Sequence, residues 1–326
     1  MSILVGVEEN NGTVHRMSWE ALAGAQAVGR DLGLPVSVVL MGEDVSGLAN
    51  SFQSKDVQEI LTVENTLLGG YSADGFSSAL SQVIEAESPK YVLMGHTYMV
   101  RDFLPRVSAK LRIPFLADNI DYSVNEGSLV LSKQVFAGKL VADTMLNTDG
   151  PCIISFQSAS FQEEDVTEGS GAAARAVSVS LEESAIHSTS GDPFQEAAGA
   201  VDLSSAEVIV SVGRGIGKEE NLPMVKDLAQ AMGAEVASSR PVVDAGWLEP
   251  YHQIGSSGQT VAPKLYLALG ISGAIQHVVG MKGSKNIILI NKDPEAPLFE
   301  LADYGIIGDI LEIVPKLTEA LLGVKT

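Results

Sequence analysis

Short apolar runs alternate with segments of helical periodicity through the first third of the chain. Short apolar runs of four to six residues predict buried strands, and apolar residues recurring at helical spacing predict amphipathic helices. The expected strands are Ile3–Val7, Pro35–Leu40, Ile60–Val63 and Tyr91–Gly95, and the expected helices are Ser18–Leu32, Val45–Phe52, Asp74–Ala86 and Arg101–Leu111. Ser18 suits the N-cap of the first helix and Gly33 its end. Regular βαβ alternation of this kind predicts a mostly parallel sheet covered by helices.

The pattern then changes twice before the midpoint of the chain. Residues 118–145 consist mainly of strands, with Leu129–Lys133 and Lys139–Met145 expected as an antiparallel extension, and Cys152–Phe156 is expected as a last strand. From Gln157 to Ala200 the chain is rich in Ser, Glu, Ala and Gly, which is typical of a surface connection, although Val177–Leu181 has the pattern of a strand. We therefore predict two domains, residues 1–190 and 191–326.

The second half repeats the alternation and predicts a second parallel α/β domain. Its expected strands are Glu207–Val212, Glu235–Ala237, Leu265–Leu269, Asn286–Ile290 and Gly305–Gly308. Its expected helices are Glu219–Met232, Gly273–Gly280, Leu298–Ala302 and Ile310–Leu322, and residues 238–263 are expected to form a long loop. Several segments that follow these strands are rich in glycine. Because open α/β sheets bind ligands at the carboxyl ends of their strands, that edge is the candidate site.

Composition narrows the class of protein. Of the 326 residues 45% are hydrophobic, which is enough for two cores, and no uninterrupted apolar run is long enough to predict a membrane span. The net charge of −20 argues against nucleic acid as a ligand. The N-terminus lacks the pattern of a secretory signal and Cys152 is the single cysteine, so we expect no disulfide within the chain and a location in the bacterial cytoplasm or the mitochondrial matrix.

Three loops of the second domain carry candidate binding residues. In GRGIGKEE, Lys218 breaks the dinucleotide fingerprint GxGxxG, and Val212 and Glu219 break the P-loop pattern, so the loop around Arg214 either binds an anion or is a plain turn. Pro241 is expected to hold Arg240 extended, where its cation faces a ligand or pairs with a surface acid. The loop Ile254–Gln259 contains the hydroxyls of Ser256 and Ser257, but a loop of Gly and Ser is also common without function.

The stretch LYLALGISGAIQHVVGM carries the most specific pattern in the chain. It predicts a strand, a turn at Gly270 to Gly273 and a helix whose free N–H groups suit an anion. Gln276 and His277 follow one turn later, where a lone histidine is equally often a packed core residue. Asn291 and Asp309 follow later strands and serve either as ligand contacts or as caps.

The chain shows no nucleophilic triad and no metal-ligand spacing. The motif GHTYMVR, with His96 and Arg101, follows a strand and is a weaker candidate for binding an anion. The candidate residues are glycine turns, hydroxyls, amides and two arginines, and they include no acid–base pair. This set favours a protein that holds a reactive cofactor over one that performs proton chemistry.

Six segments in order resemble the electron transfer flavoprotein alpha subunit: GRGIG, SRPVVDAGW, IGSSG, VAPKLYLALGISGAIQHVVGM, INKDPEAP and FELADYGIIGDI. The resemblance implies two Rossmann-like domains, of which the C-terminal one is an FAD-binding domain of the deoxyhypusine-synthase-like type and the N-terminal one packs with a beta subunit. Carried over by motif, the residues expected to contact FAD are Arg214, Ser239, Arg240, Ile254, Gly255, Ser256, Ser257, Ser272, Gly273, Ala274, Ile275, Gln276, His277, Asn291, Asp309 and Ile310.

The resemblance also implies roles for four of these residues. Arg240 lies beside the isoalloxazine, Ser257 donates to flavin N5, His277 donates to the flavin carbonyl O2, and Ser272 serves the pyrophosphate. Many relatives carry a glutamine where this chain has Ser256, so a contact made by that amide is in doubt.

The function implied is an electron carrier, with neither a catalytic residue nor a metal. It takes electrons from flavin dehydrogenases, such as acyl-CoA dehydrogenases of fatty acid β-oxidation, and passes them to a quinone reductase or another acceptor. A loose connection between the domains suits a flavin domain that swings between docking positions. The alternatives are an electron-bifurcating flavoprotein with NADH and a second FAD, an NAD-dependent enzyme of the related domain type, and a flavin-free assembly subunit.

Overall fold

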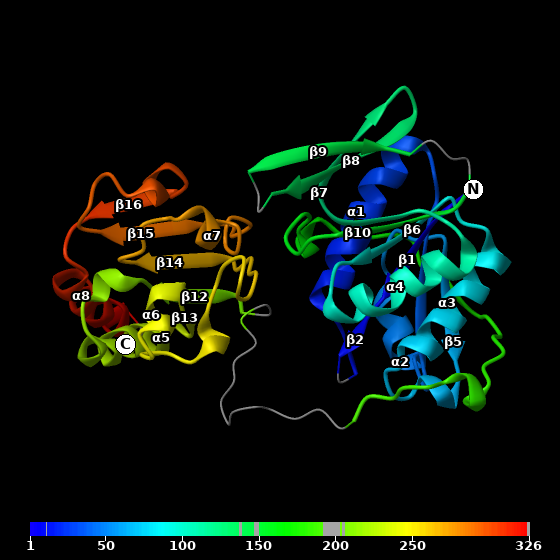
Figure 1. The fold of residues 1–326 in the computed structure, drawn as a ribbon, viewed down its shortest axis with the longest axis horizontal. Coiled ribbons are helices and arrows are strands. Elements are labelled where there is room, and N and C mark those ends of the chain that lie inside the picture. The colour runs from blue at the N-terminus through cyan, green and yellow to red at the C-terminus, as the bar shows by residue number, and fades with distance from the viewer. Residues whose placement is uncertain (11, 137–138, 147–149, 192–202, 204–205, 325–326) are drawn as a thin grey trace. The chain divides into compact units, whose positions relative to one another are not determined.

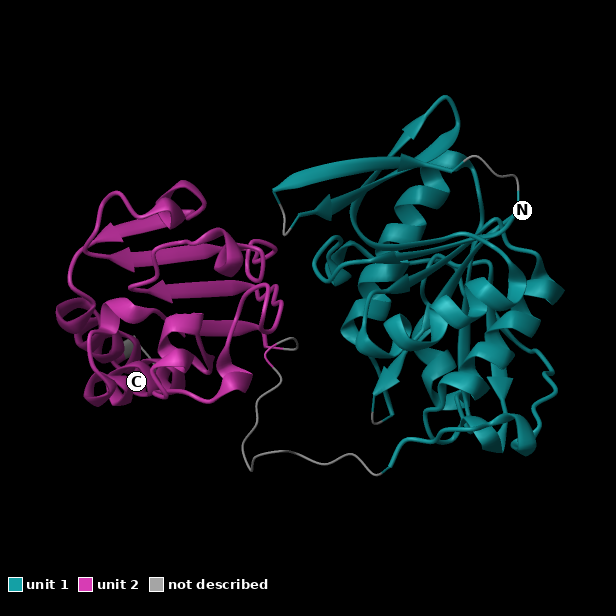
Figure 2. Ribbon diagram, in the orientation of Figure 1, with its two compact units in different colours: residues 1–194 teal, residues 195–326 magenta. Residues whose placement is uncertain are grey.

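The computed structural model describes residues 1–326 except 11, 137–138, 147–149, 192–202, 204–205 and 325–326. The chain forms two compact units, residues 1–194 and 195–326 (Figure 2). Both are α/β units built on large, mainly parallel sheets, which confirms the predicted fold class. The deoxyhypusine-synthase-like type of the second unit stays a prediction.

Unit 1 is built on a nine-stranded sheet with the order β11-β5-β4-β1-β6-β10-β7-β8-β9 (Figure 1). Its strands are β1 (Ile3–Val7), β4 (Val36–Gly42), β5 (Glu59–Glu64), β6 (Tyr91–Gly95), β7 (Phe115–Asn125), β8 (Ser128–Val135), β9 (Leu140–Met145), β10 (Cys152–Phe156) and β11 (Ala173–Ala176). The pairs from β11 to β7 are parallel, whereas β7, β8 and β9 pair antiparallel, as the sequence predicted for the last two. A small hairpin pairs β2 (Glu9–Asn10) with β3 (Thr13–Val14).

Helices cover both faces of this sheet because the strand side chains alternate between two cores. The helices are α1 (Arg16–Leu32), α2 (Ser46–Ala49), α3 (Ala73–Glu87) and α4 (Tyr98–Leu111). On β1, Ile3 and Val5 pack with α1 on one face, and Leu4 packs with α3 and α4 on the other. This alternation is the expected consequence of a strand buried on both sides.

Unit 2 is a five-stranded, wholly parallel sheet with the order β13-β12-β14-β15-β16. Its strands are β12 (Val208–Val212), β13 (Glu235–Ser238), β14 (Leu265–Leu269), β15 (Ile287–Asn291) and β16 (Tyr304–Ile307), and its helices are α5 (Leu222–Met232), α6 (Arg240–Asp244), α7 (Ile275–Val278) and α8 (Ile310–Val324). One core joins the sheet to α5 and α8. The other face is covered by loops and short turns, which contribute Leu203, Ile254, Val261 and Leu298.

Two helix starts in unit 1 differ from the prediction. Helix α1 begins at Arg16, and His15 Nδ1 accepts the N–H of Met17, so His15 is the N-cap. Ser18 was wrong as the cap because its hydroxyl bonds to the backbone of Glu8 instead. Helix α4 begins before Arg101, because Thr97 Oγ1 caps the N–H of Val100. Gly33 ends α1 in the left-handed conformation, as predicted.

The surface connection contains more structure than its composition indicated. Ala173–Ala176 pairs in parallel with β5, whereas Val177–Leu181, the predicted strand, is irregular. Gln82 exchanges two hydrogen bonds with the backbone of Ser180, and Ser190 N–H donates to Tyr71 O. The connection is therefore bound to unit 1 as far as Ser190.

Two elements of unit 2 also differ from the prediction. The helix expected at Gly273–Gly280 is a single turn, Ile275–Val278, because the chain turns at Gly280 and packs tightly on Gly255. Arg240 was expected to be extended but is the first residue of α6, where Pro241 occupies a position that proline tolerates in a first helical turn.

Candidate functional site

The candidate site is the carboxyl edge of the parallel sheet in unit 2. The order β13-β12-β14 means that the chain leaves β12 toward β13 and later returns to place β14 on the opposite side of β12. Such a reversal opens a crevice at the carboxyl ends of the two diverging strands, and open α/β sheets bind ligands there. Arg214 follows β12, Ser239 follows β13 and Gly270 follows β14. The fold thus brings together turns that lie far apart in the sequence.

The turns after β12 and β14 touch through their backbones. Gly215 N–H donates to Gly270 O at 3.1 Å, and Gly213 N–H donates to Leu269 O at 2.8 Å. A Cβ on Gly215 would lie 2.7 Å from Gly270 Cα, and Gly270 itself has φ +63°. Glycine is therefore required here by the packing of two turns. This explains GRGIG without a phosphate loop.

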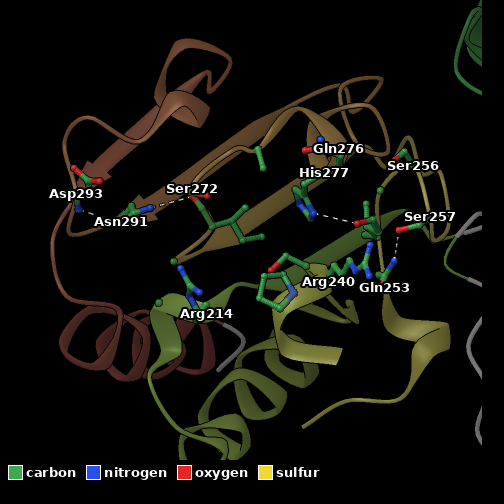
Figure 3. Close-up of a pocket in the computed structure, with 18 residues that line it drawn as sticks. Arg214, Arg240, Gln253, Ser256, Ser257, Ser272, Gln276, His277, Asn291 and Asp293 are labelled. Atoms are coloured by element: carbon green, nitrogen blue, oxygen red, sulfur yellow. Dashed lines mark hydrogen bonds between the residues drawn. The ribbon is translucent and has the colours of Figure 1, made fainter. Parts of the chain in front are cut away.

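A cavity of about 570 Å³ lies over this edge. Twelve of the sixteen expected contact residues line it: Arg214, Ser239, Arg240, Ile254, Gly255, Ser256, Ser257, Ser272, Ala274, Gln276, His277 and Asn291. Figure 3 shows that the labelled side chains form a row, with Asn291 and Asp293 at one end and Ser256 and Ser257 at the other. The cavity falls within the size range of small-molecule and cofactor sites, and its lining is elongated.

The remaining expected residues lie outside the lining. Asp309 pairs with Lys292 Nζ at 2.7 Å and accepts the N–H of Leu311, and both contacts hold the pKa of Asp309 below its usual range. Ile310 is buried in the core. Ile275 is exposed, and Gly273, with φ +92°, packs on the backbone of Leu298. These four residues shape the elements around the cavity.

The cavity has further lining residues that the sequence did not single out. They are Gly215, Pro241, Gln253, Gly270, Ile271 and Asp293. Gly270 was seen only as part of a turn. Asp293 is the one carboxylate in the lining, and the run INKDPEAP offered the only signal for it. Gln253 carried no signal, because its place depends on how the loop folds back.

A run of unpaired backbone donors extends from Ser272 to Gln276, of which Ser272, Ala274 and Gln276 line the cavity. In the described part of the chain, none of the N–H groups from Ser272 to Gln276 has a hydrogen-bond acceptor. The first N–H after Gly270 that does have one belongs to His277, which donates to Ala274 O at 2.8 Å. Consecutive unpaired N–H groups form an anion-binding concavity. The candidate anion site therefore consists of the turn before α7 and the first two residues of α7, a helix of only four residues.

The loop Ile254–Ser257 is fixed to this turn by two hydrogen bonds. Ser256 N–H donates to Gln276 O at 2.7 Å, and His277 Nδ1 contacts Ile254 O at 3.1 Å. Gly255 has φ +140°, and a Cβ there would lie 2.6 Å from Gln276 O. The loop is thus held by specific contacts on one side of the cavity.

His277 has partners at both ring nitrogens. Its Nε2 lies 2.9 Å from the hydroxyl of Tyr266, which is fully buried. A carbonyl oxygen only accepts, so Nδ1 carries the proton toward Ile254, and Tyr266 donates to Nε2 of a neutral ring. Burial lowers the pKa of His277 to about 4. The donation expected from His277 to a flavin carbonyl would need a ring nitrogen that this arrangement uses elsewhere.

The two arginines of the lining differ in their partners. Arg240 Nε lies 3.3 Å from Asp244 Oδ2, and both side chains are largely exposed. The Arg214 side chain has no ion pair or hydrogen bond with any described residue. Exposed ion pairs contribute little energy, so both guanidinium groups are available to an anionic ligand.

The other candidate anion motif does not form a site of this kind. His96 Nδ1 contacts the buried hydroxyl of Ser155 at 2.8 Å, and His96 Nε2 faces Asp118 Oδ1 at 3.9 Å. Burial lowers the pKa of His96, and the Asp118 carboxylate would repel an anion.

Over the described ranges, no group of three or more His, Cys, Asp or Glu is placed to hold a metal ion. A search of the same residues finds no helix long and apolar enough to cross a membrane.

Comparison with known proteins gives two family matches. Residues 202–282 match the model described as the electron transfer flavoprotein FAD-binding domain, and residues 3–183 match the electron transfer flavoprotein domain. An electron transfer flavoprotein subunit alpha from Bacillus subtilis is 37% identical over 97% of this chain and 96% of its own length. One from Thermoanaerobacterium thermosaccharolyticum is 35% identical over 99% and 98%. Subunit LctC of a lactate dehydrogenase (NAD(+),ferredoxin) from Acetobacterium woodii is 33% identical over 98% of this chain and 77% of its own.

Proposed function

Because the chain belongs to the electron transfer flavoprotein alpha-subunit family, we propose that it carries electrons from flavin dehydrogenases to a second acceptor. Its C-terminal domain is an FAD-binding domain, and alpha subunits of this family pair with a beta subunit. The donors in this proposal are acyl-CoA dehydrogenases, and the acceptor is a quinone reductase or a comparable protein. The bacterial relatives favour the bacterial cytoplasm over the mitochondrial matrix as the compartment.

The cavity in unit 2 has the features that an FAD molecule needs. The row from Asn291 to Ser257 suits an elongated dinucleotide. The free N–H groups of residues 272–276 suit a pyrophosphate, and the unpaired guanidinium of Arg214 adds a cation. The hydroxyls of Ser256 and Ser257 at one end, and the amide of Asn291 with the carboxylate of Asp293 at the other, suit the polar edges of two ring systems. The free N–H run is the single observation that most strongly supports this placement.

We propose a part of the cofactor for each group of residues, following their order along the cavity. Ser257 and Arg240 would hold the isoalloxazine end, residues 272–276 the pyrophosphate, and Asn291 and Asp293 the adenosine end. Asn291 also donates to Ile271 O at 3.0 Å, so part of its amide already shapes the pocket.

When bound, FAD supplies the electron chemistry, and the residues bind, orient and tune it. Arg240 stabilises negative charge at the ring end, and Ser257 offers a hydroxyl there. Asp293 and the neutral His277 both line the pocket, but they lie at different places along it and form no acid–base pair. This fits a carrier that moves electrons without breaking bonds in a carbon substrate.

Electron bifurcation is a second candidate because of one specific similarity. The relative LctC is named as a subunit of a lactate dehydrogenase that uses NAD(+) and ferredoxin. In that case a second FAD would lie in the beta subunit, and NADH would be the reductant. The match to an FAD-binding domain argues against the flavin-free assembly subunit.

The two units would divide the work. We propose that unit 1 packs with the beta subunit and that unit 2 presents FAD to the partner proteins. The FAD-binding model matches residues 202–282, within unit 2, and the other electron transfer flavoprotein model matches residues 3–183, within unit 1, which supports this division.

The test is flavin quantification in the purified heterodimer, followed by reduction. One FAD per heterodimer, reduced by an acyl-CoA dehydrogenase with its substrate, is the expected result. Two FAD per heterodimer and reduction by NADH would establish bifurcation instead. A folded, colourless heterodimer that does not take up added FAD would contradict both.

A further inference from the structure

Gln253 precedes the loop that carries Ser256 and Ser257 and lines the same cavity. It is 9% exposed, and its side-chain Nε2 donates to Ser257 Oγ at 3.0 Å (Figure 3). Its backbone is held on both sides, since its N–H donates to Pro250 O at 3.0 Å and its carbonyl accepts the N–H of Gln259 at 2.8 Å. The amide therefore reaches Ser257 from a fixed position.

This hydrogen bond sets the direction of the Ser257 hydroxyl. An amide nitrogen only donates, so it occupies a lone pair on Ser257 Oγ and leaves the single hydroxyl proton unused. In the described residues, the Ser257 hydroxyl donates to no acceptor. Ser257 is exposed and lines the cavity, so the proton is available to a ligand there. A hydroxyl that accepts one hydrogen bond also becomes a stronger donor in the next.

We propose that Gln253 is a positioning residue that holds the Ser257 hydroxyl as a hydrogen-bond donor toward the ligand. The inference rests on the proposed function, in which the acceptor is the unprotonated ring nitrogen N5 of oxidised FAD. Without the Gln253 amide, the hydroxyl can rotate and present a lone pair to that nitrogen. The contact would then be lost for part of the time.

The matched substitutions follow from the chemistry of the amide. Gln253→Met keeps the length and volume of the side chain and removes the donor. Gln253→Glu keeps the shape but can only accept, so Ser257 would donate to the carboxylate and turn away from the cavity. Ser257→Ala removes the hydroxyl itself. The double variants Gln253→Met/Ser257→Ala and Gln253→Glu/Ser257→Ala separate the positioning effect from any effect of volume or charge.

Two readouts on the full heterodimer test the proposal: the dissociation constant of FAD and the ¹⁵N chemical shift of N5 in labelled, oxidised FAD. We expect Ser257→Ala to weaken FAD binding by about twofold to tenfold, the range for one neutral hydrogen bond. Gln253→Met should weaken it less, because the freely rotating hydroxyl still donates for part of the time. Both should move the N5 shift in the same direction, toward the value without a hydrogen bond. In the Ser257→Ala background, Gln253→Met should change neither quantity further.

The outcomes separate this inference from the proposed function. Additive losses of Gln253→Met and Ser257→Ala, or an N5 shift that moves in Ser257→Ala but not in Gln253→Met, would overturn the positioning role alone. If Ser257→Ala leaves both readouts unchanged, Ser257 does not contact the flavin, and the placement of the isoalloxazine is wrong as well. If Gln253→Met fails to fold, Gln253→Glu against its own double variant gives the same comparison.

Discussion

Arg240 and Asp244 form an ion pair one helical turn apart on α6, and Arg240 lines the cavity where we propose the isoalloxazine. Both side chains are more than half exposed, so solvent screens the pair and it contributes little to stability. The positive charge therefore remains effective toward a flavin that gains negative charge on reduction. The negative charge of the Asp244 carboxylate partly offsets the positive charge of Arg240.

We expect Arg240→Ala to lower the midpoint potential of the bound flavin by tens of millivolts. A change of about 1.4 kcal/mol in the relative stability of the two redox states corresponds to about 59 mV for a one-electron couple. Potentiometric titration of the heterodimer measures it. Asp244→Asn is the matched control, because it removes the opposite charge and should raise the potential. A rise in Arg240→Ala would show that the charge argument has the wrong sign.

His277 links three segments through Tyr266 and the carbonyl of Ile254. Its pKa is lowered to about 4 by burial, whereas an ordinary histidine in the unfolded chain has a pKa near 6.5. Between these values the unfolded state binds the extra proton, so stability is present above pH about 6.5 and is lost as the pH falls toward 4.

We expect the heterodimer to lose up to about 3 kcal/mol of unfolding free energy from this residue between pH 6.5 and 4. His277→Gln has no group that titrates there, so its stability should fall less steeply over the same range. Denaturant unfolding at several pH values measures the difference. Parallel curves for the wild type and His277→Gln would mean that the ring is not held neutral by burial.

At the scale of elements, two turns that contain Gly215 and Gly270 line the site. The turns after β12 and β14 approach so closely that a Cβ on Gly215 would lie 2.7 Å from Gly270 Cα and 2.8 Å from Gly270 O. The neighbouring atoms are backbone, which cannot move aside as a flexible side chain can. A larger residue must push the two turns apart.

We expect Gly215→Ala to destabilise the heterodimer by about 1–3 kcal/mol, the usual cost of overpacking, and to weaken FAD binding. Gly47→Ala is the control, because a Cβ there meets nothing within 4 Å. Thermal unfolding and FAD titration provide the two measurements. If Gly215→Ala behaves like Gly47→Ala, the close approach of the two turns is not required.

The sequence predicted the elements whose signal is local. Buried parallel strands such as β6 and β10 were found with their exact bounds, because Tyr91–Gly95 and Cys152–Phe156 are short apolar runs. Strand β11 was missed since Ala173–Ala176 lacks a β-branched pattern and exists through its pairing with β5. The length of α7 was overestimated because the contact that ends it, Gly280 on Gly255, joins positions far apart in the chain.

The same distinction applies to the site. Residues in turns directly after strands, such as Arg214 and Ser272, could be placed at one edge from the sequence, because parallel strands end together. Gln253 could not, because its amide reaches Ser257 only through the folding of the loop. The partners of His277 were equally invisible, since Tyr266 lies on the preceding strand and Ile254 in another loop.

At the scale of the whole molecule, the connection between the units is anchored on both sides. Ser190 N–H donates to Tyr71 O in unit 1, and the fully buried Leu203 packs into the core of unit 2. Residues 191–202 join these two anchors. An extended chain spans at most about 3.3–3.6 Å per residue, so the length of this stretch limits how far the FAD domain can travel in the proposed swinging motion.

We expect deletion of residues 195–200 to slow reduction of the heterodimer by its dehydrogenase without changing its FAD content. The shorter connection would restrict the positions that unit 2 can reach. Replacement of the same residues by a Gly/Ser stretch of equal length is the control and should keep the rate. Stopped-flow reduction measures it. An undiminished rate in the deletion variant would argue against a swinging domain.

The measurement that tests the central claim most directly is a crystal structure of the heterodimer with FAD. The account expects the pyrophosphate on the free N–H groups of residues 272–276, the isoalloxazine beside Ser257 and Arg240, and the adenosine beside Asn291 and Asp293. FAD bound elsewhere on the chain, or with its pyrophosphate away from residues 272–276, would contradict it.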